Sequence, residues 1–133
     1  MSELSYEDVS DIRALLALFS HVFDNRELDD LHRVFTDDAV IELKRGAGRL
    51  VEGLPAIAEF SDVLGPDGPD HQTLDIHVYV DDTGTVRGRS RYLAILADGS
   101  VHNGDYLDEL ARTPEGWRIR RRVSVPRYPR NGG

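Results

Sequence analysis

Apolar residues recur at three- and four-residue spacings near the start of the chain, as they do on one face of an amphipathic helix. The stripe consists of Ile12, Leu15, Leu16, Phe19, Val22 and Phe23. It predicts a helix over residues 6–24. Ser5, with Asp8 three residues later, is the expected N-cap, and Asn25 is the expected left-handed residue at the C-terminal end.

A shorter second helix and two short strands are predicted next. The buried side of this helix consists of Leu28, Leu31, Val34 and Phe35. Thr36-Asp37-Asp38 is expected to end it, and residues 39–43 then alternate as a strand. Gly46 and Gly48 mark a turn, after which residues 49–52 return as a second short strand.

The third predicted helix begins at Gly53-Leu54-Pro55, because proline is tolerated in a first helical turn. Its apolar stripe consists of Ile57, Phe60, Val63 and Leu64. The segment 65–70 is rich in glycine and proline and is expected to be a loop.

From His71 onward the pattern changes to four long strands without a helix. Turn residues separate the strands at 81–84, 98–99 and 113–116. The last strand is predicted over residues 117–125, and Pro126 and Pro129 are expected to end it.

Helices that precede a meander of strands indicate an α+β fold. We expect a cone-shaped, strongly curved antiparallel sheet of about six strands, with the three N-terminal helices covering its concave face. Such a cone leaves a cavity between helices and sheet, where a ligand site is expected. The length of 133 residues fits a single domain, with a core over residues 6–125 and a tail over 126–133.

The composition narrows the classes of partner. The net charge of −8 disfavours nucleic acid and anionic membranes as partners. The chain has no cysteine, no recognisable signal peptide and no apolar run long enough for a membrane span, and we expect a cytoplasmic protein. A basic stretch near the C-terminus is interpreted as a solvated strand face and tail. It consists of Arg118, Arg120, Arg121, Arg122, Arg127 and Arg130.

The order of elements and several local sequences resemble the SnoaL-like branch of the nuclear transport factor 2-like superfamily. The resembling stretches are FDNRELDDL at 23–31, FTDDAV at 35–40, GLPAIAEF at 53–60, a histidine that opens the third strand, DYLDEL at 105–110 and TPEGWRI at 113–119. The resemblance spans residues 6–125 and is specific for the fold. It is not specific for the reaction, because this fold hosts dehydratases, isomerases, cyclases and non-catalytic domains.

The resemblance implies a His–Asp pair inside the cone, which falls here on His71 and Asp24. A neutral imidazole is a suitable base near pH 7, and a carboxylate can orient it and stabilise its charged form. Asp24 ends a helix, where the macrodipole disfavours a carboxylate, so a partner is expected. From the residues alone, a solvated helix end and a loop histidine remain an open alternative.

Further pocket residues are predicted from strand alternation and from the resemblance. The candidates for substrate contact are Tyr92, Tyr106, His102, Phe19 and Phe23. Either tyrosine is expected to donate a hydrogen bond to a substrate oxygen or to pack as an aromatic side chain. On the third strand the polar set Asp75, His77 and Tyr79 competes with an apolar set for the inner face, and alternation does not decide between them.

Two functional hypotheses follow. The first is a cofactor-independent lyase or isomerase-type enzyme that performs dehydration, β-elimination, isomerisation or cyclisation on a small apolar molecule. His71 would be the base and Asp24 its supporting carboxylate. The second is a non-catalytic ligand-binding or assembly domain, whose signature would be a filled cavity or one in which His71 and Asp24 lie out of contact. We expect no metal, no cofactor and, under either hypothesis, a homodimer formed through the outer face of the sheet.

Overall fold

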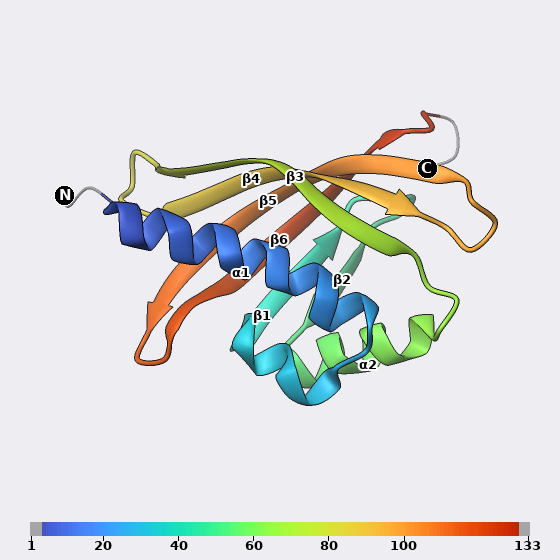
Figure 1. The fold of residues 1–133 in the computed structure, drawn as a ribbon, viewed down its shortest axis with the longest axis horizontal. Helices are drawn as coiled ribbons and strands as arrows, with labels where there is room; N and C mark the ends of the chain where they lie inside the picture. Colours follow the sequence, from blue (N-terminus) through green and yellow to red (C-terminus); the bar gives the residue numbers. More distant parts are fainter. Residues whose placement is uncertain (1–3, 131–133) are drawn as a thin grey trace.

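Helical segments dominate the first half of the chain and long strands the second half. The computed structural model describes residues 4–130. In chain order the elements are α1 (Tyr6–Asp24), the 3-10 helix η1 (Leu28–Arg33), β1 (Phe35–Leu43), β2 (Arg49–Glu52), α2 (Leu54–Leu64), β3 (Asp70–Val80), β4 (Val86–Ile95), β5 (Val101–Thr113) and β6 (Gly116–Tyr128). The α+β prediction is therefore confirmed, and the helices lie on one side of a curved sheet (Figure 1).

The six strands form one open sheet in the order β2-β1-β6-β5-β4-β3. The hairpin pairs are antiparallel as predicted, but β1 and β6 run parallel. The sheet is therefore mixed rather than wholly antiparallel. A tight turn forces its two strands to be antiparallel, whereas β1 and β6 are far apart in sequence and no turn dictates their relative direction.

The first strand is longer than predicted, because Phe35 and residues 36–38 belong to it. Phe35 pairs with Ile119 of β6, and the Ile119 amide donates to the Val34 carbonyl over 2.7 Å. The pairs with β6 at Phe35 and Val40 flank the two aspartates, which lie where the register shifts. These flanking pairs hold the segment in a strand despite the poor strand propensity of aspartate. The last strand is also longer than predicted, because β6 continues through Pro126 to Tyr128.

A bulge in β3 decides which of its side chains face the cavity. Asp75 has a left-handed backbone (φ 55°), and the pairing register with β4 shifts between Leu74 and His77. One extra residue reverses the alternation of a strand. His71 therefore faces inward before the bulge, and the partly buried Val78 packs against the core after it. After the bulge the apolar set supplies the inner face through Ile76 and Val78, whereas Asp75, His77 and Tyr79 are exposed.

The core lies between α1 and the concave face of the sheet. Ile12, Leu16 and Val22 of α1 are at most 1% exposed, so the predicted apolar stripe is confirmed. On α2 the buried residues are Ile57 and Ser61, whereas Val63 of the predicted stripe is 75% exposed.

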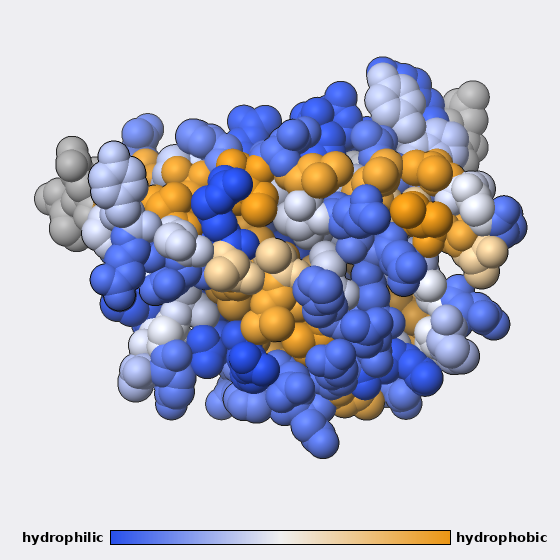
Figure 2. Space-filling model, viewed as in Figure 1, coloured by the Kyte–Doolittle hydropathy of each residue, from blue (hydrophilic) through white to orange (hydrophobic). Residues whose placement is uncertain are grey.

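Hydrophilic residues cover most of the face shown in Figure 2, and apolar residues gather in a band across it. Within residues 4–130, neither helix combines the length and apolarity that a bilayer crossing requires.

Candidate functional site

The C-terminal end of α1 positions Asp24. The Arg26 amide donates to the Phe23 carbonyl over 3.2 Å, and the Glu27 amide donates to the Val22 carbonyl over 2.9 Å. These two bonds form a Schellman motif. Its left-handed residue is Arg26 (φ 53°), one residue later than predicted, since Asn25 has φ −87°.

A side chain of α2 secures the same helix end. The Ser61 hydroxyl, which is buried, donates to the Phe23 carbonyl over 2.7 Å. This bond is a second one to the Phe23 carbonyl, which lies in the last turn, where the helix itself supplies no donor. The position of Asp24 is thus set by its own helix, by the reversal that follows and by α2.

His71, near the start of β3, meets the Asp24 carboxylate through two groups. The Nδ1 atom lies 2.7 Å from Asp24 Oδ1, and the backbone amide donates to Oδ2 over 2.5 Å. The side chains are 16% and 7% exposed. Because the carboxylate can only accept, the ring hydrogen lies on Nδ1, and Nε2 carries the lone pair of the neutral ring. The contact also places two donors at a helix end that otherwise disfavours a carboxylate.

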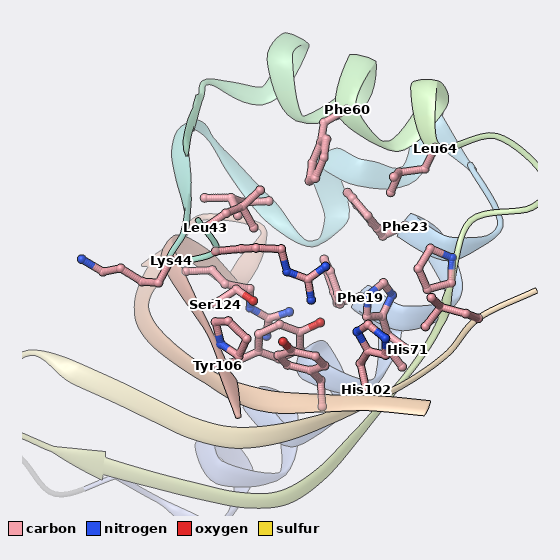
Figure 3. Close-up of a pocket in the computed structure, with 18 residues that line it drawn as sticks. Phe19, Phe23, Leu43, Lys44, Phe60, Leu64, His71, His102, Tyr106 and Ser124 are labelled. Carbon is pink, nitrogen blue, oxygen red and sulfur yellow. The ribbon is translucent and has the colours of Figure 1, made fainter. Parts of the chain in front are cut away.

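His71 lies on the wall of a cavity with an internal volume of about 220 Å³. The five predicted contact residues line the same cavity, and Figure 3 labels four of them. The lining residues are Phe19, Phe23, Ile41, Leu43, Lys44, Arg45, Phe60, Leu64, Pro69, His71, Tyr92, Ala94, Leu96, His102, Tyr106, Arg122, Ser124 and Pro126. Asp24 is not among them and therefore contacts the cavity only through His71.

Strand register brings His102 onto the face that carries His71. His71 pairs with Ala94, and Ala94 pairs with His102. The small side chain of Ala94 separates the two imidazoles, which lie near one another in Figure 3. Strand alternation grouped His102 with Tyr106, and the family resemblance implied that this face points inward, but only the sheet order puts His102 two strands from His71.

Two tyrosines form the floor of the cavity beside His71. The rings of Tyr92 and Tyr106 stack with centroids 4.9 Å apart, and the His71 ring lies 6.1 Å from the Tyr92 ring. Gly104 makes this possible, because a Cβ there would collide with the Tyr92 ring and the Val125 carbonyl. Burial raises the pKa of Tyr106 well above its usual range, so its hydroxyl remains protonated and able to donate.

A buried ion pair beneath the tyrosines was not predicted. Arg122 Nε and Nη2 donate to the two Asp108 oxygens over 2.7 and 2.8 Å, and the side chains are 1% and 0% exposed. Arg122 Cζ also lies 3.8 Å from the centre of the Tyr106 ring and 4.3 Å from that of Phe19. Burial opposes the charge of Arg122, but the Asp108 carboxylate more than offsets this and raises the pKa of the guanidinium.

The interpretation of the C-terminal arginines as a solvated face is therefore wrong for Arg122. The register of β5 with β6 shifts where Glu109 pairs with Arg121 and Leu110 with Ile119. Arg120 is the extra residue, so the alternation reverses and Arg122 points inward. A signal was present in the partner strand, because Asp108 shares its alternation with Tyr106.

The remaining histidines do not join the site. His77 lies on the outer side of β3 and stacks on Tyr79 with ring centroids 5.1 Å apart. His21 and His32 are exposed. Among residues 4–130, no group of three or more His, Asp or Glu side chains is arranged to hold a metal ion.

Comparisons with known proteins agree on the fold. A variant of Rv3472, a protein of unknown function from Mycobacterium tuberculosis, superposes with a TM-score of 0.81 at 25% identity, over 95% of this chain and 75% of that one. A candidate scytalone dehydratase from Novosphingobium aromaticivorans superposes with a TM-score of 0.75 at 19% identity, over 91% of this chain and 85% of that one.

Sequence comparison defines the family. Residues 5–123 match the model of the SnoaL-like domain. The uncharacterized protein Rv2910c from Mycobacterium tuberculosis is 38% identical, over 93% of this chain and 90% of its own length. The chain therefore belongs to the SnoaL-like domain family.

Proposed function

We propose that this protein is a cofactor-independent acid–base enzyme of the lyase or isomerase type, acting on a small and largely apolar molecule. The observation that carries the proposal is the 2.7 Å contact between His71 Nδ1 and Asp24 Oδ1 on the wall of an apolar cavity. The similarity to a candidate scytalone dehydratase supports the same class of reaction.

The first step is removal of a proton from a carbon atom next to a carbonyl group. His71 Nε2 accepts this proton, and the electron pair of the C–H bond moves into an enolate. Asp24 keeps the hydrogen on Nδ1 and stabilises the imidazolium that forms, without taking the proton itself. The low exposure of both side chains strengthens this electrostatic support.

The negative charge that develops on the substrate oxygen needs a hydrogen-bond donor. The Tyr106 hydroxyl is a suitable donor because burial raises its pKa and keeps it protonated. The enolate then has three outcomes. In the first, the enolate expels a β-hydroxyl group, which leaves as water with the proton from His71. In the second, it takes that proton back at another carbon. In the third, it attacks a second carbonyl group and closes a ring, and the alkoxide that forms takes the proton from His71.

The alternative of a non-catalytic binding domain predicts a filled cavity or His71 and Asp24 out of contact. Their 2.7 Å separation and the second bond from the His71 amide favour the enzyme instead. A histidine that only lined a binding cavity would not need two donors fixed on one carboxylate.

The test uses 5-nitrobenzisoxazole, an apolar bicyclic compound that releases a coloured phenolate when a base removes the proton from its ring carbon. The wild-type protein should open the ring faster than free imidazole at equal concentration. His71→Ala should lower the rate by about a hundred- to ten-thousandfold. Asp24→Asn should lower it by at least about tenfold, because an amide does not stabilise the imidazolium.

The matched control is His77→Ala, which removes an exposed imidazole from the outer side of the same strand and should leave the rate unchanged. Thermal melting establishes that each variant is folded. Turnover that survives both His71→Ala and Asp24→Asn undiminished, or a wild-type rate no greater than that of free imidazole, contradicts the proposal.

A further inference from the structure

The charges around the cavity are opposite to those of the whole protein. The chain has 24 acidic and 16 basic residues. The cavity is nevertheless lined by Lys44, Arg45 and Arg122 and, among the described residues, by no aspartate or glutamate. In a protein with a net charge of −8, this local excess of cations points to a ligand with a negative group.

Two of the three cations already have a carboxylate partner. Arg122 is held by Asp108, and the Lys44 ammonium lies 2.7 Å from Glu42 Oε2. The Lys44 ammonium and, to a smaller extent, the Arg121 guanidinium hold the pKa of Glu42 below its usual range. Glu42 is therefore a charged partner for both cations.

Arg45 differs from the other two. Its side chain forms no ion pair and no hydrogen bond with any residue between 4 and 130. An arginine that lines a cavity with all five of its donors available is suited to a carboxylate, which it can bind through two parallel bonds.

The place of Arg45 in the fold puts this free cation at the mouth of the cavity. Arg45 follows the end of β1, in the turn that leads to β2, and is exposed. Leu43, Lys44 and Arg45 all contribute to the lining, but in Figure 3 the end of the Lys44 side chain extends away from the cavity. The charge of Arg122 elsewhere in the lining is neutralised, because Arg122 and its partner Asp108 are both buried.

We propose that the ligand of this cavity is a small organic acid, with a ring inside the cavity and its carboxylate bound by Arg45 at the mouth. A dry apolar cavity of about 150 Å³ accommodates benzene, so about 220 Å³ accommodates a substituted single ring. The inference deepens the proposed function and rests on it for the role of His71, which would act at the end of the ligand remote from the carboxylate.

The experiment compares three acids with their uncharged counterparts. Benzoate, phenylacetate and hydrocinnamate, together with the corresponding primary amides, are titrated into the wild-type protein at low salt and followed by two-dimensional amide NMR. At least one acid should bind about tenfold more tightly than its amide, the lower end of the range for a charged hydrogen bond because Arg45 is exposed. Added salt should weaken the binding of the acid and leave the binding of the primary amide unchanged.

Three variants assign the effect to Arg45. Arg45→Gln should abolish the preference for the acid and leave the affinity for the amide unchanged. Lys44→Gln removes the same charge at the neighbouring position, and Arg33→Gln removes it at an exposed position outside the cavity lining. Each of these two controls should change the affinity for the acid by less than about threefold.

The inference is overturned if no acid is preferred over its amide, if Arg45→Gln weakens acid and amide alike, or if Lys44→Gln is as damaging as Arg45→Gln. It is also overturned if none of the acids or primary amides shifts the backbone NMR signals of the residues that line the cavity. Melting temperatures close to that of the wild type establish that the variants are folded.

Failure of this inference can be distinguished from failure of the proposed function. The acid preference is a ratio of affinities and does not depend on proton transfer, so His71→Ala should retain it. A protein that binds acids through Arg45 but opens no benzisoxazole would refute the function alone. A protein that opens benzisoxazole through His71 but shows no acid preference would refute this inference alone.

Discussion

Breaking the buried Arg122–Asp108 pair should destabilise the protein far more than breaking an exposed ion pair. The perturbation is Asp108→Leu, which removes both acceptors of the guanidinium. Arg122 is 1% exposed and lies between the rings of Phe19 and Tyr106. Its charge would therefore stay buried without a counter-ion. The Nη1 atom already lacks a hydrogen-bond partner within the described residues.

The expected cost is about 3–5 kcal/mol, the range for an uncompensated buried charge. A domain of this size has a free energy of unfolding of about 5–15 kcal/mol, so the expected cost is a large part of the total stability. At about 4 °C per kcal/mol, the melting temperature should fall by about 12–20 °C. The double variant Asp108→Leu/Arg122→Met should return to within about 1 kcal/mol of the wild type, because well-packed apolar residues can replace a buried pair.

Urea unfolding gives the free energies, with the fluorescence of Trp117 as the reporter. This residue is the only tryptophan in the chain and is 8% exposed in the folded state. The matched control is Arg120→Ala, which breaks a contact with Glu109 between the same two strands. The Arg120 and Glu109 side chains are 49% and 22% exposed, so loss of this ion pair should lower the free energy of unfolding by less than about 1 kcal/mol.

Two results would refute the reasoning. One is a loss of less than about 1 kcal/mol for Asp108→Leu, which would mean that the guanidinium finds water or another acceptor. The other is a double variant whose loss of unfolding free energy equals the sum of the losses in Asp108→Leu and Arg122→Met alone. Such additivity would mean that the two side chains do not interact energetically.

Two further predictions concern the cavity floor. The folded protein holds the Tyr106 proton more tightly than the unfolded chain, whose tyrosine pKa is about 10, so burial should make the free energy of unfolding fall as the pH rises above about 10. Urea titrations should show this fall reduced in Tyr106→Phe, and an equal fall in both proteins would contradict it. Gly104→Ala should cost about 1–3 kcal/mol in the same assay, since its Cβ collides with Tyr92 and the Val125 carbonyl. Gly88→Ala, whose Cβ would meet its nearest neighbours at 3.4 and 3.5 Å, should cost less.

The elements of the fold follow closely from the sequence. The apolar stripe of α1 and the turn residues between the long strands are local signals, and the structure confirms the elements that they predict. The predictions failed where contacts between distant segments compete with local preference. The pairs with β6 at Phe35 and Val40 flank Asp37 and Asp38 and hold this segment in a strand, although its composition favours the end of a helix.

The candidate site was predictable to a smaller extent. The resemblance paired His71 with Asp24 and gave the inward face of Tyr106 and His102, and alternation with the arginines of the fourth strand located Tyr92. Arg122 was missed because a single extra residue at Arg120 reverses the alternation of β6. The inner face of β3 was undecidable for the same reason, since the bulge at Asp75 divides that strand between two alternations.

The sequence by itself determined the helices, the hairpins, the α+β class and the residue types available for chemistry, because these depend on periodicity and turn propensity within a few residues. The tertiary structure decided the direction of β1 relative to β6, the faces of β3 and β6, and the contact between His71 and the end of α1. Those features depend on pairing and packing between segments that lie far apart along the chain. The free energy of such contacts belongs to neither segment alone, and no local pattern in the sequence records it.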